Sequence, residues 1–177
     1  MQIKEFKNQN NIKNIFVDLD ETLIHTNLAG KDHPNEVEEV EINIASELGR
    51  KDIYPVSLRP GATKLLFALR EIGQVYMLTR ATKDYAIAMN KVFGLGFLVD
   101  RIYDREFVKR FNIKPNIPNG NNYLIDDLSS YDNYEKIKFI EQLGPPKYIQ
   151  IKAFYGFKEE AITSSMIAEI VEIIKKD

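Results

Sequence analysis

Carboxylates follow two of the most apolar stretches of the sequence. Asp18 and Asp20 come after IFV, and Asp126 and Asp127 come directly after YLI. Thr79 ends a third apolar stretch, QVYML. A charge at the end of a buried strand is costly to remove from water, so these side chains either cap turns or serve chemistry.

Several carboxylates at one place repel one another unless a cation neutralises them. The sequence contains no cysteine and only two histidines, which excludes thiolate sites and argues against a multi-histidine zinc centre. Mg²⁺ is the cation that suits an oxygen-only set of ligands. Mg²⁺ held by one or two carboxylates together with a phosphate is typical of phosphoryl transfer.

Each residue type has a use in such a site. Asp18 is a candidate nucleophile that forms an aspartyl-phosphate. Asp20, two residues later, can protonate the leaving oxygen and then deprotonate the attacking water. Thr79 can donate a hydrogen bond to a phosphoryl oxygen, and a lysine can stabilise the transferred charge. Together these residues predict hydrolysis of a phosphomonoester.

The elements that must position these residues are buried strands separated by helices. NIKNIFVD, QVYMLT, NYLIDD and KYIQIKAF are typical of buried strands. RPGATKLLFALREIG, RATKDYAIAMNKVFG and EEAITSSMIAEIVEIIKK have the spacing and end signals of helices. This alternation predicts an α/β fold with a parallel sheet covered on both faces, and ligands bind beyond the carboxyl ends of such strands.

Two further segments complete the predicted domain, which comprises residues 1–177. The alternating pattern of EVEEVEINI and IYPVSLR predicts a β-hairpin insertion over residues 36–58 with one solvated acidic face. FLVDRIYDREFV and the Pro/Asn-rich loop after it predict a short β/loop insertion over residues 98–120. Neither segment is large enough to form a mobile cap, so we expect an open site.

Composition limits the partners. The chain is 44% hydrophobic and 28% charged, as expected of a soluble globular protein, and its formal net charge of −2 gives no overall basic field for nucleic acid. No apolar run has the length of a membrane span, and the N-terminal residues lack the apolar core of a signal peptide. We therefore expect no membrane partner and a cytoplasmic location, or a nuclear one in a eukaryote.

The motifs resemble those of a known superfamily. DLDET, MLT, a downstream lysine and IDD, in that order, resemble the four motifs of the haloacid dehalogenase (HAD) superfamily. DLDETLIHT, SLRPGATKLLFAL, LTRATKDYA and YDREFV are similar to its small phosphatases that act on the C-terminal domain of RNA polymerase II, the FCP/SCP type. The resemblance extends over residues 12–151. It implies a HAD-like, Rossmann-like three-layer sandwich with a minimal cap.

The resemblance also implies roles for individual residues. Asp18 would be the nucleophile and Asp20 the general acid/base, with Thr79 bound to the phosphoryl group and Thr22 shaping the first motif loop. Arg80 follows Thr79, where the family has a small residue, and could bind a second anionic group of the substrate or point into solvent.

The metal ligands and the lysine follow from the same resemblance. Asp127 would ligate Mg²⁺ together with Asp18 and the Asp20 main chain, and Asp126 would support or ligate the metal. Lys114 in NIKPN is the candidate lysine, and Lys109 is its rival.

Three hypotheses remain open for the activity. The resemblance implies a protein phosphoserine/threonine phosphatase, with Val40 and Ile42 as candidate walls of a proline pocket. A second hypothesis keeps the chemistry and changes the substrate to a nucleotide, a sugar phosphate or a polynucleotide 3′-phosphate end, bound by a basic rim. The third is a catalytically silent binding module, and the presence of all four motif acids argues against it.

Overall fold

Five parallel strands form the central sheet of the computed structural model, which describes residues 12–27, 36–45, 51–110 and 114–176. Along the sheet the strands run in the order β6, β5, β1, β7, β8. Their bounds are Lys13–Val17 for β1, Gln74–Leu78 for β5, Arg101–Tyr103 for β6, Asn121–Asp126 for β7 and Pro146–Gln150 for β8. Every neighbouring pair is parallel, which confirms the predicted sheet.

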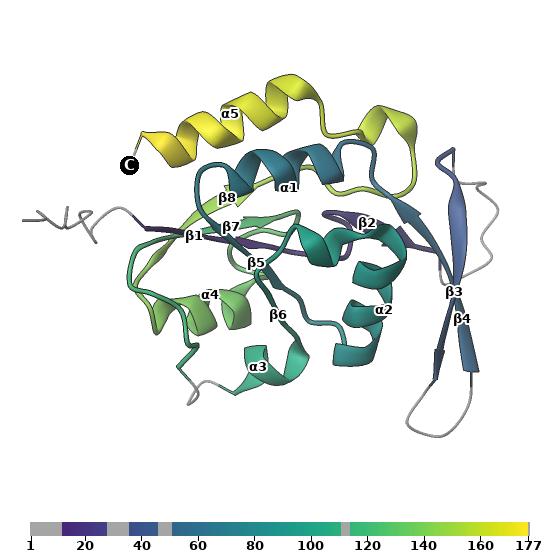
Figure 1. Cartoon of the computed structure of the whole chain (residues 1–177), viewed down its shortest axis with the longest axis horizontal. Coiled ribbons are helices and arrows are strands. Elements are labelled where there is room, and N and C mark those ends of the chain that lie inside the picture. Colours follow the sequence, from purple (N-terminus) through teal and green to yellow (C-terminus); the bar gives the residue numbers. More distant parts are fainter. Residues whose placement is uncertain (1–11, 28–35, 46–50, 111–113, 177) are drawn as a thin grey trace, which may run out of the picture.

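Helices cover both faces of this sheet because its strands are apolar on both faces. Ile15 and Val17 of β1 face one core and Phe16 faces the other, as alternation along a strand requires. The first core is closed by α1 (Ala62–Arg70), α2 (Lys83–Phe93) and α5 (Ser164–Lys175), and the second by α3 (Arg105–Lys109) and α4 (Tyr134–Glu141). Figure 1 shows α1 and α5 above the sheet and α3 and α4 below it, which is the three-layer sandwich expected.

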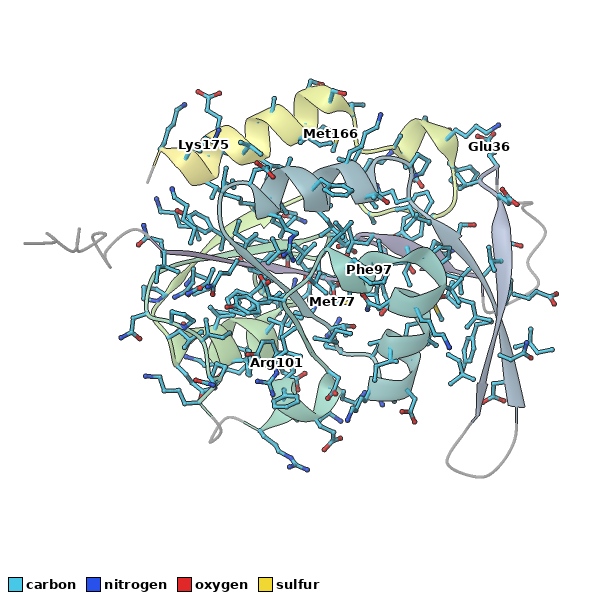
Figure 2. All side chains as sticks on the ribbon, viewed as in Figure 1. Glu36, Met77, Phe97, Arg101, Met166 and Lys175 are labelled. Atoms are coloured by element: carbon cyan, nitrogen blue, oxygen red, sulfur yellow. The ribbon has the colours of Figure 1, made fainter. Side chains whose placement is uncertain are left out.

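Side chains fill the space between these layers. Figure 2 shows them between the sheet and the helices, with Met77 of β5 in the interior, where it has no exposed surface. Two short 3₁₀ helices, Leu95–Phe97 and Lys158–Glu160, lie in the connections. None of the helices in the described residues is long and apolar enough to span a membrane.

A second, antiparallel sheet leaves the main body beside the site. It consists of β2 (Ile24–Thr26), β4 (Lys51–Leu58) and β3 (Glu39–Ala45), in the order β2, β4, β3. The predicted hairpin is therefore present and gains a third strand, because the chain enters β2 directly after the first motif loop. Residues 46–50 of the predicted range lie outside the described residues.

The structure differs from the sequence-based interpretation in two segments. Within the range 98–120, of which residues 111–113 are outside the described part, β6 pairs with β5 as an edge strand of the main sheet, and α3 follows it. Helix α4, between β7 and β8, was not anticipated. It buries Lys136, Phe139 and Ile140, which have the i, i+3, i+4 spacing of a helix face, although one of the three is a lysine.

The register of the parallel strands brings the motif residues to one edge. Val17 of β1 lies opposite Met77 of β5 and Ile125 of β7, so the three strands end within a residue of one another at the same edge of the sheet. The amide of Asp18 donates to the carbonyl of Ile125, and the amide of Thr79 donates to Tyr103 at the end of β6. The carboxyl ends of four strands thus surround the candidate site.

Candidate active site

A buried lysine joins two of the motif acids. Nζ of Lys136 lies 2.8 Å from Oδ1 of Asp18 and 2.7 Å from Oδ2 of Asp126. The side chain of Lys136 is 1% exposed, and those of Asp18 and Asp126 are 8% and 0% exposed. The second oxygen of Asp126, Oδ1, accepts a hydrogen bond from the amide of Leu128 at 3.0 Å. Asp126 is therefore held rigidly from both sides.

Burial and the ion pair act together on the pKa values of Asp18 and Lys136. Burial raises the pKa of Asp18 to about 7, although the Lys136 ammonium acts in the opposite direction. Burial alone would lower the pKa of Lys136, but the carboxylates of Asp18 and Asp126 outweigh it and raise that pKa. Lys136 therefore stays charged, and its ammonium favours the ionised form of Asp18 against the effect of burial.

The structure corrects the choice of lysine. Lys136 comes from α4, ten residues after Asp126, whereas Lys114 and Lys109 are both exposed, Lys114 on the segment before β7 and Lys109 at the end of α3. Within the described residues, the two buried acids form their ion pairs with Lys136. The interpretation failed because it searched for the lysine before the IDD motif and did not anticipate α4.

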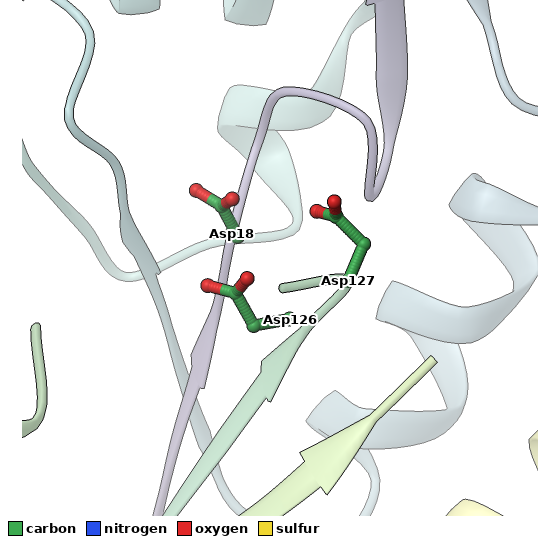
Figure 3. A group of neighbouring side chains, drawn as sticks. All are labelled: Asp18, Asp126 and Asp127. Atoms are coloured by element: carbon green, nitrogen blue, oxygen red, sulfur yellow. The ribbon is translucent and has the colours of Figure 1, made fainter. Parts of the chain in front are cut away.

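A cation site is available in front of these acids. Asp18, Asp126 and Asp127 each offer one carboxylate oxygen, and these oxygens lie within 4.8 Å of one another. Figure 3 shows the three side chains as neighbours near the ends of two strands. Oγ1 of Thr22 donates to Oδ1 of Asp127 at 2.8 Å, which fixes that carboxylate from the first motif loop. Burial raises the pKa of Asp127 as well. A hard divalent cation such as Mg²⁺ fits this oxygen-only set and would offset the repulsion among its members.

Asp20 lies on the other side of Asp18, in the first motif loop. Its Oδ1 accepts a 2.7 Å hydrogen bond from the hydroxyl of Tyr85, and its Oδ2 lies 3.4 Å from Oγ1 of Thr79. Burial raises the pKa of Asp20 despite these donors. A raised pKa favours the protonated carboxyl, which is the form that a general acid requires.

Thr79 and its loop border the same space. Thr79 is buried, and its hydroxyl oxygen accepts a 3.0 Å hydrogen bond from the amide of Ala81. Arg80 is exposed, and its carbonyl accepts a 2.8 Å hydrogen bond from Nε of Arg105. Arg105, a residue of the basic rim considered from the sequence, therefore lies beside Arg80.

The first motif loop is fastened to a distant part of the chain. Glu21 has a positive φ of 59°, rare for a residue with a side chain, and its carbonyl accepts a 2.7 Å hydrogen bond from the amide of Phe154. The buried guanidinium of Arg59 donates to the carbonyl of Thr22 at 3.2 Å and to that of Glu160 at 2.7 Å. Residues near the C-terminal end of the chain thus hold the turn between the nucleophile candidate and β2.

One proposed wall of a substrate pocket is buried. Ile42 is 4% exposed and packs in the core against the helices, so it does not line a pocket. Val40, its neighbour on the same face of β3, is 38% exposed. Helix α2 packs against β3, and this contact covers Ile42, which the alternation of the strand alone does not reveal.

Comparison with known proteins identifies the family. Residues 13–166 match the model of the NLI interacting factor-like phosphatase family. The chain belongs to this family. The matched range includes the four motif acids, Thr79 and Lys136. No curated protein matches the sequence of this NLI interacting factor-like phosphatase.

Solved structures share the fold. Two structures of Fcp1, an RNA polymerase II CTD phosphatase, match with 18% identity and a TM-score of 0.57, and one of them is a fission yeast variant bound to beryllium fluoride. The match covers 95% of this chain and 50% of the Fcp1 chain, so the present chain spans about half the length of Fcp1. The HAD domain of effector protein Lem4 from Legionella pneumophila matches with 14% identity and a TM-score of 0.51, over 95% of this chain and 96% of that one. At these identities the likeness shows the HAD fold.

Proposed function

We propose that this chain is a Mg²⁺-dependent phosphomonoester hydrolase that works through an aspartyl-phosphate on Asp18. The observation that carries the proposal is the buried ion pair of Asp18 with Lys136, next to the oxygens of Asp126 and Asp127. A buried carboxylate with an ammonium on one side and a cation site in front is poised to attack an electrophile that carries negative charge.

The residues divide the reaction into two steps. In the first, an oxygen of Asp18 forms a bond to phosphorus, the bond from phosphorus to the leaving oxygen breaks, and Asp20 gives its proton to that oxygen. In the second, Asp20 takes a proton from water, whose oxygen attacks phosphorus, and the bond to Asp18 breaks to release phosphate. Lys136 and the hydroxyl of Thr79 stabilise the negative charge of the transferred group.

The acids would hold the metal in front of the nucleophile. Asp18 and Asp127 are the ligands proposed for Mg²⁺, with the Asp20 main-chain carbonyl. Asp126 is engaged by Lys136 and by the Leu128 amide, which favours a supporting role for it over that of a ligand. When bound, Mg²⁺ would neutralise the phosphoryl oxygens and so allow an anionic nucleophile to approach.

We propose a protein phosphoserine or phosphothreonine as the substrate. The support is the family, the position of the site beside the antiparallel sheet, and the exposed Val40 on β3 as an apolar contact for a peptide. The Fcp1 structures are of an RNA polymerase II CTD phosphatase, so a phosphoserine peptide is the first substrate to test. The exposed Arg80 and neighbouring Arg105 favour a second candidate, a small or nucleic-acid phosphomonoester with a further anionic group.

The test measures hydrolysis of p-nitrophenyl phosphate with Mg²⁺ and with EDTA, in the wild type and in Asp18→Asn. The matched control is Asp52→Asn, which makes the same charge change at an exposed position of β4. We expect activity that requires both Mg²⁺ and Asp18, and a phosphoenzyme that is trapped by acid quench in the wild type and in Asp52→Asn but not in Asp18→Asn. Activity in Asp18→Asn comparable to that of Asp52→Asn would refute the nucleophile, and an inactive wild type that still binds Mg²⁺ would favour the silent binding module.

The value of kcat/KM is then compared among several substrates. They are phosphoserine peptides with and without a following proline, nucleotides and 3′-phosphorylated oligonucleotides. A higher kcat/KM for a peptide supports the first substrate class. A higher value for a nucleotide or an oligonucleotide end would replace it with the second.

A further inference from the structure

The carboxyl group of Asp20 is held unequally by its two neighbours. Tyr85, in the first turn of α2, donates to Oδ1 at 2.7 Å, whereas Thr79 lies 3.4 Å from Oδ2. A hydrogen bond to a carboxylate weakens steeply beyond normal distances, so the Tyr85 contact dominates. One oxygen of Asp20 is therefore firmly occupied, and the other is nearly free.

Tyr85 is itself fixed by the antiparallel sheet. Its hydroxyl oxygen lies 2.5 Å from Oγ1 of Thr26, the last residue of β2. A tyrosine hydroxyl has a single proton, and when that proton is directed to Asp20 the proton of the second contact must come from Thr26. The ring of Tyr54 on β4 packs edge-on against the ring of Tyr85, with centroids 5.7 Å apart and planes at 84°. The hydrogen bonds thus run from Thr26 to Tyr85 to Asp20.

We propose that Tyr85 is a positioning residue that determines which oxygen of Asp20 carries the transferred proton. The inference rests on the proposed function, because it assigns a task within the first step. When Oδ1 accepts from Tyr85, the proton of the carboxyl group resides on Oδ2. As the Asp18–phosphorus bond forms and the bond from phosphorus to the leaving oxygen breaks, that proton passes from Oδ2 to the leaving oxygen. In this role Tyr85 acts through Asp20.

The antiparallel sheet contributes to the hydrogen bonds that orient Asp20. Thr26 and Tyr54 belong to β2 and β4, and both act on Tyr85, so the strand that follows the first motif loop also orients its acid. The competing explanation is that Tyr85 merely packs α2 against the sheet. The two explanations differ in what they predict for substrates with good and poor leaving groups.

The decisive variant is Tyr85→Phe, which keeps the ring and removes the donor. A weakly basic leaving group such as p-nitrophenolate departs without a proton, whereas the alkoxide of phosphoserine requires one. We expect kcat/KM for a phosphoserine peptide to fall by about 10- to 100-fold, the effect of losing a hydrogen bond to a charged group, and kcat/KM for p-nitrophenyl phosphate to fall by less than about threefold. The quantity kcat/KM is chosen because it reports only the steps through departure of the leaving group.

Three controls accompany this variant. Tyr134→Phe removes a hydroxyl from an exposed ring on α4 and leaves both kcat/KM values unchanged. Thr26→Val removes only the donor to Tyr85 and gives a smaller loss with the same preference for the good leaving group. In an Asp20→Asn background, Tyr85→Phe has no further effect on the ratio of the two kcat/KM values, because the group that it positions is gone.

Equal losses for both substrates in Tyr85→Phe, or no loss for either, would overturn the role of Tyr85 while the wild type remains an active phosphatase. Absence of Mg²⁺-dependent turnover in the wild type would overturn the proposed function itself, and the role of Tyr85 with it. The two failures are therefore distinguished by the wild-type measurement alone.

Discussion

Replacing Lys136 by methionine tests the central ion pair. Methionine keeps a long side chain of similar shape but leaves Asp18 and Asp126 facing each other without the ammonium. Removal of one partner of a buried ion pair destabilises a protein by about 3–5 kcal/mol. At about 2–4 °C per kcal/mol for a chain of this size, Tm falls by roughly 6–20 °C in the absence of metal.

The loss also depends on pH in a defined direction. Lys136 lowers the pKa of Asp18, so its removal raises that pKa further above the unfolded value. A carboxyl group whose pKa is raised by folding stabilises the protein below its unfolded pKa, and this contribution is lost as the pH rises through the folded pKa. The deficit of Lys136→Met relative to the wild type is therefore larger at pH 8 than at pH 5.

The assay is thermal unfolding in EDTA at both pH values, followed by circular dichroism. Lys138→Met is the matched control, because Lys138 lies on the same helix, is 43% exposed and pairs with Glu141 at the surface. A surface substitution of this kind changes the free energy of unfolding by no more than about 0.5 kcal/mol. If Lys136→Met melts in EDTA at pH 8 within the range of Lys138→Met, the ammonium is not the charge that holds the buried acids together.

Three further outcomes follow from the site. In EDTA the wild type loses stability as the pH rises from about 4 to about 7, because burial raises the pKa of Asp18 to about 7. A melting temperature that rises steadily over this pH range would contradict this prediction. Asp127→Asn weakens Mg²⁺ binding by about 10- to 100-fold, measured by the Mg²⁺-dependent shift of Tm. The control is Asp132→Asn, which changes an exposed acid in the next loop. An equal Mg²⁺-dependent shift of Tm in the two variants would show that Asp127 is not a metal ligand. Arg59→Met lowers the free energy of unfolding by about 1–3 kcal/mol, because two buried carbonyls lose their hydrogen-bond donor. Arg70→Met removes a surface ion pair and changes this free energy little. Equal effects of the two substitutions would refute the role of Arg59 in holding the first motif loop.

The sequence predicts the sheet and its catalytic edge because both depend on local pattern. Apolar runs that end in Asp18 or Asp126 identify buried strands and their carboxyl ends together, and parallel order then brings the ends to one place. The intervening helices follow from spacing and from end signals such as the glycine after α2. These features need no knowledge of distant contacts.

The lysine could not be located in the same way. A lysine side chain is long and reaches a site from any neighbouring helix, so its place in the sequence is weakly determined by geometry. Lys136 shares a buried helix face with Phe139 and Ile140, and a cation on an otherwise apolar face was the signal that could have found it. Ile42 illustrates the reverse case, since the helix that covers it is remote in sequence.

The hydrogen bonds from Phe154 and to Glu160 have a consequence for synthesis of the protein. All four motif acids and Lys136 have been translated before these two residues are added. The hydrogen bonds that hold the turn at Glu21, however, form only when the later residues have left the ribosome and packed against the first motif loop. A nascent chain therefore carries every candidate reacting group before the turn that positions the first two acids is held in place.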